Sequence, residues 1–477
     1  MTDPHATAAD AGALADLSMP RKVHIVGIGG AAMSAIAIVL AGTGHEVSGS
    51  DQRGSDTIER LGRAGISVAI GHDPSNVPAG VEVVAVSTAI PEDNVELAEA
   101  HRRGLAVCSR EAMMVAILEG RSVVAVAGTH GKTTTSAMLA MVLRDAGLDP
   151  SFIIGGDLKE VGSGAALGSG DLFVVEADES DSSFLGLPRQ VAIVTNVEPD
   201  HIEHYGGMDC LEEAFEHFLE GAAGMRLVCA DDPRAALLGE RAGAITYGTA
   251  ASAEYRLVDV VSTRERVTFG IDHGGRRIAE AAVPMAGIHN ARNACAALVA
   301  GIGLGASVEQ ACESLARFSG VARRFEHRGE MGGVCFIDDY AHLPAEVSAM
   351  VSAALDCKWR RIVCIFQPHR YSRTATLWTE FGDAFAGVDQ LVVTGIYPAG
   401  EQPRAGVSAK LIVDAVLDRH PRQQVAYLPD RADLGPYVTG VLRPGDLCLT
   451  LGAGDLTTLP DELMRSLSGG RTRTQQP

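Results

Sequence analysis

The fold prediction starts from one segment, Ser122-Val-Val-Ala-Val-Ala-Gly-Thr-His-Gly-Lys-Thr-Thr-Thr135. An apolar run leads into a glycine turn, a lysine and three threonines, and a helical pattern continues over Ser136–Ala146. This is a strand, a tight loop and a helix N-terminus, where backbone N–H groups and the helix dipole favour an anion. Lys132 is expected to reach the terminal phosphates of a nucleotide, and the Thr133 hydroxyl to contact Mg²⁺. Val126 stands where the general phosphate-loop pattern has glycine.

Length and composition indicate an acidic protein of several domains. A chain of 477 residues is too long for one core, so two to four domains are expected. The net charge of −20, from 40 basic and 60 acidic residues, argues against a non-specific nucleic-acid binder. Nine scattered cysteines without a CxxC pair favour reduced thiols over a disulfide framework or a zinc site. Met1–Pro20 lacks the basic region of a secretory signal, and no apolar run reaches the length needed to span a membrane. We therefore predict a cytoplasmic protein without membrane insertion.

The first α/β unit is predicted over residues 21–120, after a disordered leader at 1–20. A strand over Lys22–Gly27 runs into Gly27-Ile-Gly-Gly-Ala-Ala32, which has the GxGxxA form of a Rossmann-like phosphate loop. Alternating strand and helix patterns follow and predict a parallel, doubly wound sheet. Asp51 ends the second strand and is a candidate for a ribose or uracil contact, with a helix cap as the alternative.

The second unit, residues 121–321, begins with the phosphate loop. Two of its strands end in polar residues, Glu176-Ala-Asp-Glu-Ser-Asp181 and Glu198-Pro-Asp-His201. Carboxyl ends of parallel strands share one sheet edge, and Mg²⁺ prefers oxygen ligands, so a metal site is expected there. Short β-like runs over residues 254–283 predict an antiparallel patch.

The third unit, residues 322–468, is also α/β and precedes a polar tail at 469–477. Arginine and histidine follow its strands in Asp338-Asp-Tyr-Ala-His342 and Phe366-Gln-Pro-His-Arg-Tyr-Ser-Arg373, after Arg323-Arg324. Arginine forks suit phosphate and carboxylate, so an anionic ligand is predicted. Gly452-Ala-Gly-Asp455 is interpreted as a simple turn.

Eight segments in chain order resemble the Mur ligases, the ATP-dependent amide-forming enzymes of peptidoglycan precursor synthesis. They are His24–Gly30, Gly128–Thr135, Glu176–Asp181, Asn196–His201, His289-Asn290 with Asn293, Arg323–Phe325, Asp339–His342 and Gln367–Tyr371. The resemblance extends from about Arg21 to Leu467. It implies three domains: a Rossmann-like UDP-sugar domain, a central ATPase domain with a parallel sheet and a small antiparallel patch, and a Rossmann-like C-terminal domain.

Within the family, the residues are most similar to the branch that adds L-alanine to UDP-N-acetylmuramate. The resemblance implies that ATP phosphorylates the muramoyl carboxylate and that L-alanine displaces phosphate from the acyl phosphate. Phosphorylation supplies the leaving group that a carboxylate lacks. Catalysis would then rest on positioning and on neutralising charge with Mg²⁺, lysine and arginine. Oligomeric state is left open between monomer and dimer.

The resemblance also assigns site residues. Catalytic roles fall to Lys132, His201, Arg324 and His342. ATP contacts are Gly128, Thr129, His130, Gly131, Lys132, Thr133, Thr134, His289, Asn293 (adenine), Arg324 (phosphates) and Asp339 (ribose). UDP-sugar contacts are Gly27, Gly29, Gly30, Asp51, His72, Ser87 and Thr88. Amino-acid contacts are His342, His369, Arg370, Tyr371 and Arg373. Metal contacts are Thr133, Glu176 and His201, with Glu179 as a further candidate.

The chain departs from the family pattern in three places. Leu343 stands for a second histidine and Ala345 for a threonine, while Ala32 and Ala35 replace glycines of the first loop. No lysine lies within residues 202–357, so the carbamylated lysine of other Mur ligases has no counterpart here.

Three alternatives stay open. A related ligase that attaches a recycled peptide to the same sugar nucleotide would share the UDP domain and differ in its amine pocket. The GxGxxA loop with Asp51 also suits an NAD-dependent dehydrogenase, which would leave Gly128–Thr135 unexplained. A catalytically silent UDP-sugar sensor is the third.

Overall fold

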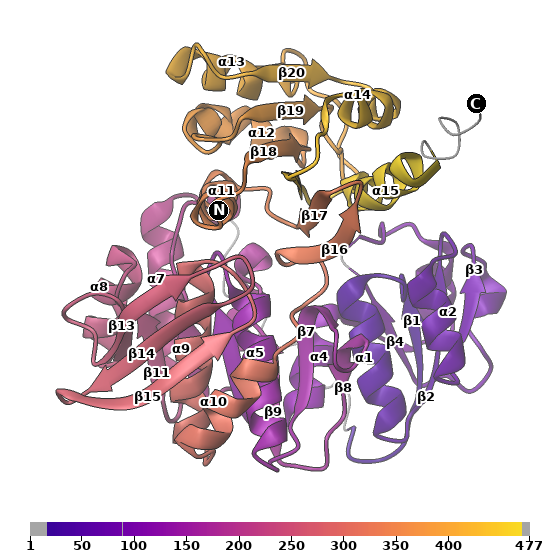
Figure 1. Cartoon of the computed structure of the whole chain (residues 1–477). Coiled ribbons are helices and arrows are strands. Elements are labelled where there is room, and N and C mark those ends of the chain that lie inside the picture. Colours follow the sequence, from indigo (N-terminus) through magenta and orange to yellow (C-terminus); the bar gives the residue numbers. More distant parts are fainter. Residues whose placement is uncertain (1–16, 88, 470–477) are drawn as a thin grey trace. The chain divides into compact units, whose positions relative to one another are not determined.

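The computed structural model describes residues 17–87 and 89–469 (Figure 1). Most of the predicted leader, the candidate Thr88 and the polar tail from residue 470 lie outside the described residues. The chain forms two compact units. Of the described residues, the first unit holds those up to 257 together with 271–279 and 292–318, and the second holds 258–270, 280–291 and those from 319 to 469.

The first sheet confirms the predicted doubly wound α/β pattern. Its five parallel strands lie in the order β3-β2-β1-β4-β5. The chain order is β1 (Lys22–Val26), α1 (Ala31–Gly42), β2 (Glu46–Asp51), α2 (Asp56–Arg63), β3 (Ser67–Ile70), β4 (Val83–Val86), α3 (Val95–Arg102), β5 (Ala106–Ser109) and α4 (Arg110–Leu118). Strand order reverses between β1 and β4, so the loop after β1 opens into the crevice where such sheets bind ligands.

The central sheet has ten strands in the order β15-β14-β13-β12-β11-β10-β6-β9-β7-β8. Its elements are β6 (Ser122–Ala127), α5 (Lys132–Asp145), β7 (Ser151–Leu158), β8 (Ser163–Ala166), β9 (Leu172–Glu176), β10 (Val191–Val194), α6 (Ile202–Tyr205), α7 (Met208–Glu220), β11 (Arg226–Cys229), α8 (Pro233–Ala242), β12 (Ile245–Gly248), β13 (Tyr255–Ser262), β14 (Val267–His273), β15 (Arg276–Val283), α9 (Ile288–Gly303) and α10 (Val308–Arg317). β6 is central and pairs in parallel with β9 and β10. A two-residue turn, Gly274-Gly275, joins β14 to β15, and so short a connection permits only antiparallel pairing.

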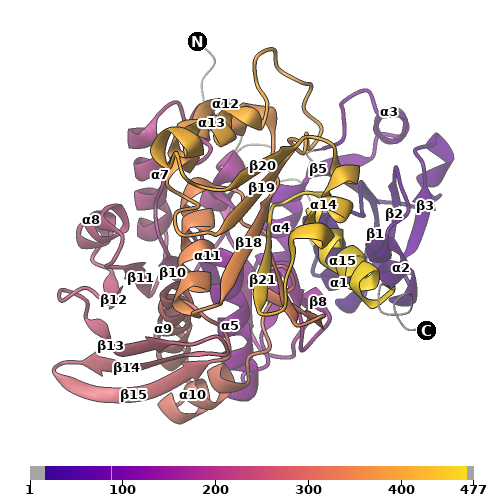
Figure 2. The ribbon, with the colours of Figure 1, turned by 45° about the horizontal axis from the view of Figure 1, so that its top comes forward.

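The second unit contains a six-stranded sheet in the order β16-β17-β21-β18-β19-β20. Its elements are β16 (Glu326–Met331), β17 (Val334–Asp339), α11 (Pro344–Asp356), β18 (Arg361–Phe366), α12 (Tyr371–Leu377), β19 (Gln390–Thr394), α13 (Lys410–Arg419), β20 (Val425–Leu428), α14 (Leu434–Val441), β21 (Asp446–Leu451) and α15 (Leu459–Gly469). Residues of α11, α12 and α13 build the core on one face, and those of α14 and α15 build it on the other (Figure 2). Only β16 is antiparallel to its neighbour.

Sequence patterns missed several elements. β7 and β8 form an antiparallel hairpin whose register shifts over a stretch that includes Gly155 and Gly156, and small residues leave no apolar alternation to recognise. β16 is an edge strand, and Met331 is its one apolar side chain. The helices α8 and α10 were also missed.

A buried ion pair anchors β21 to β18 and gives a first test. Arg361 donates from Nε to Asp446 Oδ1 at 3.1 Å and from a terminal nitrogen to Oδ2 at 2.6 Å, while the Asp446 side chain is 2% exposed. Asp446→Ala would leave the arginine without its carboxylate, so we expect the second unit to lose about 2–4 kcal/mol of unfolding free energy. Tryptophan fluorescence in urea measures this, since Trp359 and Trp378 both lie in the second unit.

Asp414→Ala is the matched control, because Asp414 pairs with Lys410 on an exposed helix face. That pair is expected to contribute about 0–1 kcal/mol. Equal effects of the two substitutions would contradict the assignment of Asp446 as an anchor.

Candidate active site

The loop between β6 and α5 owes its shape to two glycines. Gly128 has φ +126° and Gly131, the N-cap of α5, has φ +81°, a region that disfavours side chains. A Cβ on Gly128 would collide with the Thr195 hydroxyl and lie 2.9 Å from the Thr195 backbone nitrogen. A Cβ on Gly131 would lie 2.7 Å from Asn293 Oδ1. The loop therefore fits against its neighbours only with glycine at both positions.

The end of β10 holds this loop in place. The backbone N–H of His130 donates to Asn196 Oδ1 at 2.8 Å, and that of Thr129 donates to the Asn196 carbonyl at 3.2 Å. Asn196 and Thr195 donate in return to the carbonyl of His130. The Glu198 N–H donates to the Thr129 hydroxyl at 2.8 Å. The segment Asn196–His201, selected from sequence as a motif, thus supports the phosphate loop directly.

Lys132 is mostly buried, with 14% of its side chain exposed, and is paired with a carboxylate. Its ammonium donates to both carboxylate oxygens of Glu179, at 2.9 and 2.8 Å, and to the Gly128 carbonyl at 2.7 Å. Burial alone would lower the pKa of Lys132, but Glu179, Asp178 and Glu176 together raise it above its ordinary value. Lys132 is therefore a permanent cation at the N-terminus of α5.

The candidate metal ligands lie at the start of α5, at the end of β9 and in the segment after β10. Thr133 is 2% exposed at the start of α5, and Glu176 ends β9 with one oxygen accepting from the Gly155 N–H at 2.7 Å. His201 has φ +55°, uncommon outside glycine and typical of functional turns, and its backbone N–H donates to Asp200 Oδ1 at 2.9 Å.

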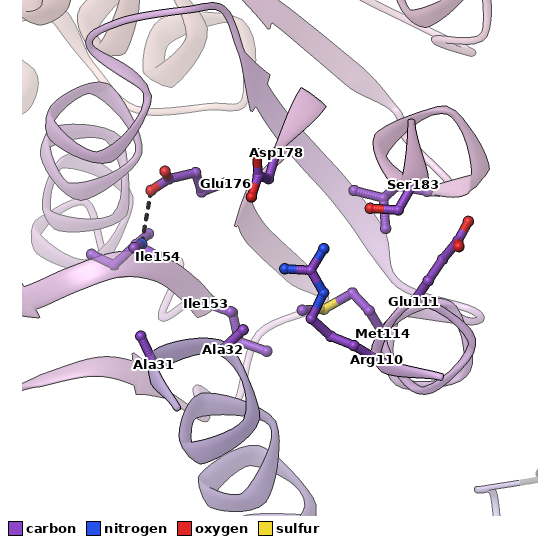
Figure 3. A pocket seen from close by; sticks show the side chains of 12 residues that line it. Ala31, Ala32, Arg110, Glu111, Met114, Ile153, Ile154, Glu176, Asp178 and Ser183 are labelled. Atoms are coloured by element: carbon purple, nitrogen blue, oxygen red, sulfur yellow. Dashed lines mark hydrogen bonds between the residues drawn. The ribbon is translucent and has the colours of Figure 1, made fainter. Parts of the chain in front are cut away.

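A pocket of about 320 Å³ joins this site to the first sheet (Figure 3). Glu176 and Asp178 line it from the central sheet, and Ala31 and Ala32 line it from the start of α1. Arg110 lines it from α4, extends towards the side where Asp178 lies, and donates to Asp181 Oδ2 at 2.6 Å. The start of α1 after the first glycine loop, two carboxylates at the end of β9 and one arginine therefore share a single cavity. Sequence reasoning missed Arg110, although its place directly after β5 was a usable signal.

The first glycine loop is tied to the end of β2. The N–H groups of Gly27 and Ile28 donate to the Ser50 carbonyl at 2.9 and 3.0 Å, and the Gly29 N–H donates to Asp51 Oδ2 at 2.9 Å. The N-cap of α2 is Ser55, so Asp51 is not a helix cap. Asp51 shapes the loop from beside it.

Glu96 of α3 is fully buried beneath this loop and was missed from sequence. Its carboxylate accepts hydrogen bonds from the Ser50 hydroxyl at 2.6 Å and from Asn76 at 2.9 Å, and it lies 3.1 Å from the His24 ring and 3.2 Å from the His72 ring. Burial would raise the pKa of Glu96, but these bonds outweigh it and lower the pKa to about 2. The candidate His72 is thus oriented by a buried carboxylate.

In the second unit, Asp339 organises the loop that carries the candidate arginines. It is 4% exposed and accepts from the N–H groups of Phe325 at 2.6 Å and Ala341 at 2.7 Å. Burial, against the pull of Arg324, raises the pKa of Asp339 to about 6. Arg324 lies over the Tyr340 ring at 5.2 Å, a cation–π distance.

The candidates for amino-acid contact form a second group in this unit. The rings of His342 and His369 are 5.5 Å apart, and His369 stacks on Tyr397 at 5.7 Å. Arg373 lies 3.1 Å from His369 Nδ1, and Arg370 has φ +69° at the N-cap of α12, directly before Tyr371. Burial, then His342 and the arginines, lower the pKa of His369 to about 3, so it is neutral.

Carbonyl groups of the turn at Gly452–Asp455 accept from Arg323, at 2.6 Å for Gly452 and 3.2 Å for Gly454. This agrees with the structural interpretation of that turn.

Comparison with known families accounts for all three sheets. Residues 22–122 match the family model described as "Mur ligase family, catalytic domain", residues 126–301 match "Mur ligase middle domain", and residues 323–454 match "Mur ligase, glutamate ligase domain". The chain belongs to the Mur ligase family.

Individual Mur ligases agree over nearly the whole chain. The UDP-N-acetylmuramate–L-alanine ligase of Desulforamulus reducens is 42% identical over 94% of this chain and 98% of its own length. The enzyme of that name from Rubrobacter xylanophilus is 45% identical over 94% of this chain and 100% of its own length. The crystal structure of UDP-N-acetylmuramate–alanine ligase from Thermotoga maritima matches with a TM-score of 0.80 and 28% identity, over 94% of this chain and 99% of that one.

Within this Mur ligase, the first unit brings together Gly128–Thr134, Asn293, Glu176 and Glu179. Of these, Glu176 also lines the pocket of Figure 3, which the start of α1 lines from the other side. Asn293 contacts the phosphate loop at Gly131. Ser87 lies at the end of β4, where its hydroxyl accepts from the Ala89 N–H. His289 is the second residue of α9 and, with the candidates from Arg324 onward, belongs to the second unit. Membership of the family leaves the dehydrogenase interpretation without support.

Glu96 gives a pH test. Its pKa falls from 4.5 unfolded to about 2 folded, so its contribution is fully present above pH 4.5 and is lost as the pH falls towards 2. Glu96→Gln should therefore reduce the unfolding free energy at neutral pH by about 2–3 kcal/mol and flatten its decline between pH 4.5 and 2.

Urea unfolding at several pH values measures the difference between the two proteins. Glu59→Gln is the control, since Glu59 is exposed on α2, and should change stability by less than about 0.5 kcal/mol. Parallel pH profiles for wild type and Glu96→Gln would contradict the account.

Proposed function

We propose that this chain is an ATP-dependent ligase that joins L-alanine to the muramoyl carboxylate of UDP-N-acetylmuramate, releasing ADP and phosphate. The relatives that cover nearly the whole chain carry the name of this activity. The observation that carries the proposal is the pocket that the start of α1 shares with Glu176 and Asp178 of the central sheet, because the charges of these two carboxylates act on the Lys132 ammonium. A reaction between a sugar-nucleotide carboxylate and the γ-phosphate of ATP needs this adjacency.

The phosphate loop binds ATP in this proposal. Backbone N–H groups at the N-terminus of α5 face the phosphates, and the Lys132 ammonium exchanges Glu179 for phosphate oxygens. Lys132 then stabilises the charge that accumulates on the transferred phosphoryl group. Asn293 contacts the nucleotide from beside Gly131.

The donor set beside the loop fits Mg²⁺. The Thr133 hydroxyl and the Glu176 carboxylate are oxygen ligands of the kind that Mg²⁺ prefers, with His201 and Glu179 as further ligands. Bound Mg²⁺ would neutralise phosphate charge. Glu176 keeps a fixed orientation through the Gly155 N–H, so this chain supplies a positioned carboxylate.

The first sheet holds the UDP-sugar. Gly27, Gly29 and Gly30 form the loop for the diphosphate, Asp51 and His72 contact the nucleoside, and Arg110 meets the muramoyl carboxylate in the pocket. This orientation directs the carboxylate towards the γ-phosphate site. Ala32, which lines the pocket, replaces a glycine of the family pattern without closing the cavity.

Residues of the second unit supply the remaining contacts in this proposal. Arg324 contacts the phosphates, Asp339 the ribose, and His342 and His369 with Arg370, Tyr371 and Arg373 the incoming amino acid. Because the pKa of His369 is lowered, its imidazole is neutral. It therefore places no positive charge beside the amine of the incoming amino acid. The amine must be unprotonated to attack the acyl phosphate.

We infer that the protein works in the cytoplasm, where ATP and sugar nucleotides are available. All nine cysteines are free in the structure, as expected in a reducing compartment. No helix in the described part of the chain is long and apolar enough to span a membrane.

Lys132→Ala tests the ATP site. Removing the ammonium should lower the rate of phosphate release by about 10²–10³-fold, the size of effect seen when one preorganised charge-stabilising group is lost. The matched control is Lys159→Ala, an exposed lysine of the same unit, which should keep wild-type turnover. Unchanged turnover in a folded Lys132→Ala protein would refute the assignment, and a wild type without turnover would favour the sensor.

Amine specificity is tested by phosphate release from ATP in the presence of UDP-N-acetylmuramate. L-Alanine should stimulate release most, ahead of glycine and L-serine, and a murein tripeptide should not stimulate it. A stronger response to the tripeptide would replace the proposed reaction by peptide reattachment.

A further inference from the structure

The edge strand β16 carries a bulge that changes which side chains share a face. Glu326 and His327 pair with Asp338 and Ile337 of β17, and the register then shifts between His327 and Gly329. Side chains three positions apart on a regular strand point to opposite faces. The extra residue in the bulge places His327 on the same face as Glu330, which pairs directly with Cys335.

Three metal-ligating side chains converge as a result. The nitrogen, oxygen and sulfur ligand atoms of His327, Glu330 and Cys335 all lie within 4.8 Å of one another. His327 and Glu330 are exposed and Cys335 is buried, so the group opens to solvent on one side. Among the residues that the structure describes, it is the one group of three such side chains at this spacing.

The remaining side chains of the bulge are used elsewhere. Arg328 donates to Asp461 of α15 at 2.6 Å, and a Cβ on Gly329, at φ +137°, would meet Met464 of α15 at 3.3 Å. Helix α15 therefore covers the opposite face. This leaves His327 and Glu330 on the uncovered side of the edge strand.

The sulfur, nitrogen and oxygen ligand atoms indicate which class of metal ion fits this group. Thiolate, imidazole and carboxylate are the ligands of Zn²⁺ at about 2.0–2.3 Å, so two atoms on one ion lie at most about 4.5 Å apart. The observed spacing needs only small side-chain adjustments. Mg²⁺ prefers oxygen ligands in octahedral geometry and is not suited to this set.

We propose that His327, Glu330 and Cys335 form a binding site for a borderline transition-metal ion of the Zn²⁺ class, with solvent as a further ligand. The metal–sulfur bond forms as the Cys335 thiol releases its proton to solvent. The site lies in the second unit, uses none of the residues assigned to ATP, and ties the edge strand β16 to β17. Binding to the folded state alone stabilises that unit.

Cobalt(II) is the probe, because a thiolate bound to Co²⁺ gives a charge-transfer band in the near ultraviolet. Full-length protein with excess Mg²⁺ is titrated with Co²⁺ and then with Zn²⁺. We expect one equivalent of Co²⁺ to produce the band, Zn²⁺ to abolish it, and Zn²⁺ to raise the thermal midpoint of the second unit. Absence of the band in folded wild-type protein overturns the proposal.

The variants identify the ligands. Cys335→Ser and His327→Gln should each lose the band and the Zn²⁺-dependent stabilisation, and the exposed His327 can be changed without disturbing the core. Cys210→Ser and His101→Gln, an exposed thiol and an exposed imidazole elsewhere, are the controls and should keep both. A band that survives Cys335→Ser or His327→Gln places the metal elsewhere and refutes the site.

Discussion

The candidate active site depends on how closely the loop after β6 approaches the end of β10. No Cβ fits between Gly128 and Thr195, and the amide and hydroxyl side chains of that strand end bond the backbone of His130. Buried backbone groups must find partners, so the neighbouring strand sets the loop's conformation. The conformation of the candidate phosphate loop is thus set by the fold itself, and ligand binding would not have to order it.

Charge balance is the second constraint. The protein carries a net charge of −20, and two cations of the candidate site are already paired, Lys132 with Glu179 and Arg110 with Asp181. An anionic ligand must therefore compete with a resident carboxylate. A triphosphate, with several charges and many acceptor oxygens, competes better than a monoanion. Resident carboxylates thus favour highly charged ligands, because weaker anions gain too little to displace them.

The sequence predicted those parts of the fold in which the residue types allow only one physical interpretation. Most apolar strands, the two glycine turns that lead into helices and the polar segments after β9 and β10 lie where the sequence predicted them, because burial and positive φ angles leave few alternatives. Glu96 and Arg110 were missed, since a single charged residue in a helix usually faces solvent. Their surroundings come from strands far away in the chain. The group at His327 was hidden for a related reason: its spacing is meaningful only with the bulge, which sequence did not reveal.

Leu343 stands where the family pattern has a second histidine, directly after the candidate catalytic residue His342. The structure shows how this leucine is accommodated. Leu343 precedes α11 and is 5% exposed within the core of the second unit, so it cannot cap the helix with a polar side chain. Glu346 takes over that task and accepts from the N–H groups of His342 at 2.8 Å and Leu343 at 3.1 Å. His342 Nδ1 also lies 3.0 Å from the Tyr340 carbonyl. The position of His342 is therefore set by its own backbone and by Glu346. A leucine at the next position alters the packing and leaves that geometry in place.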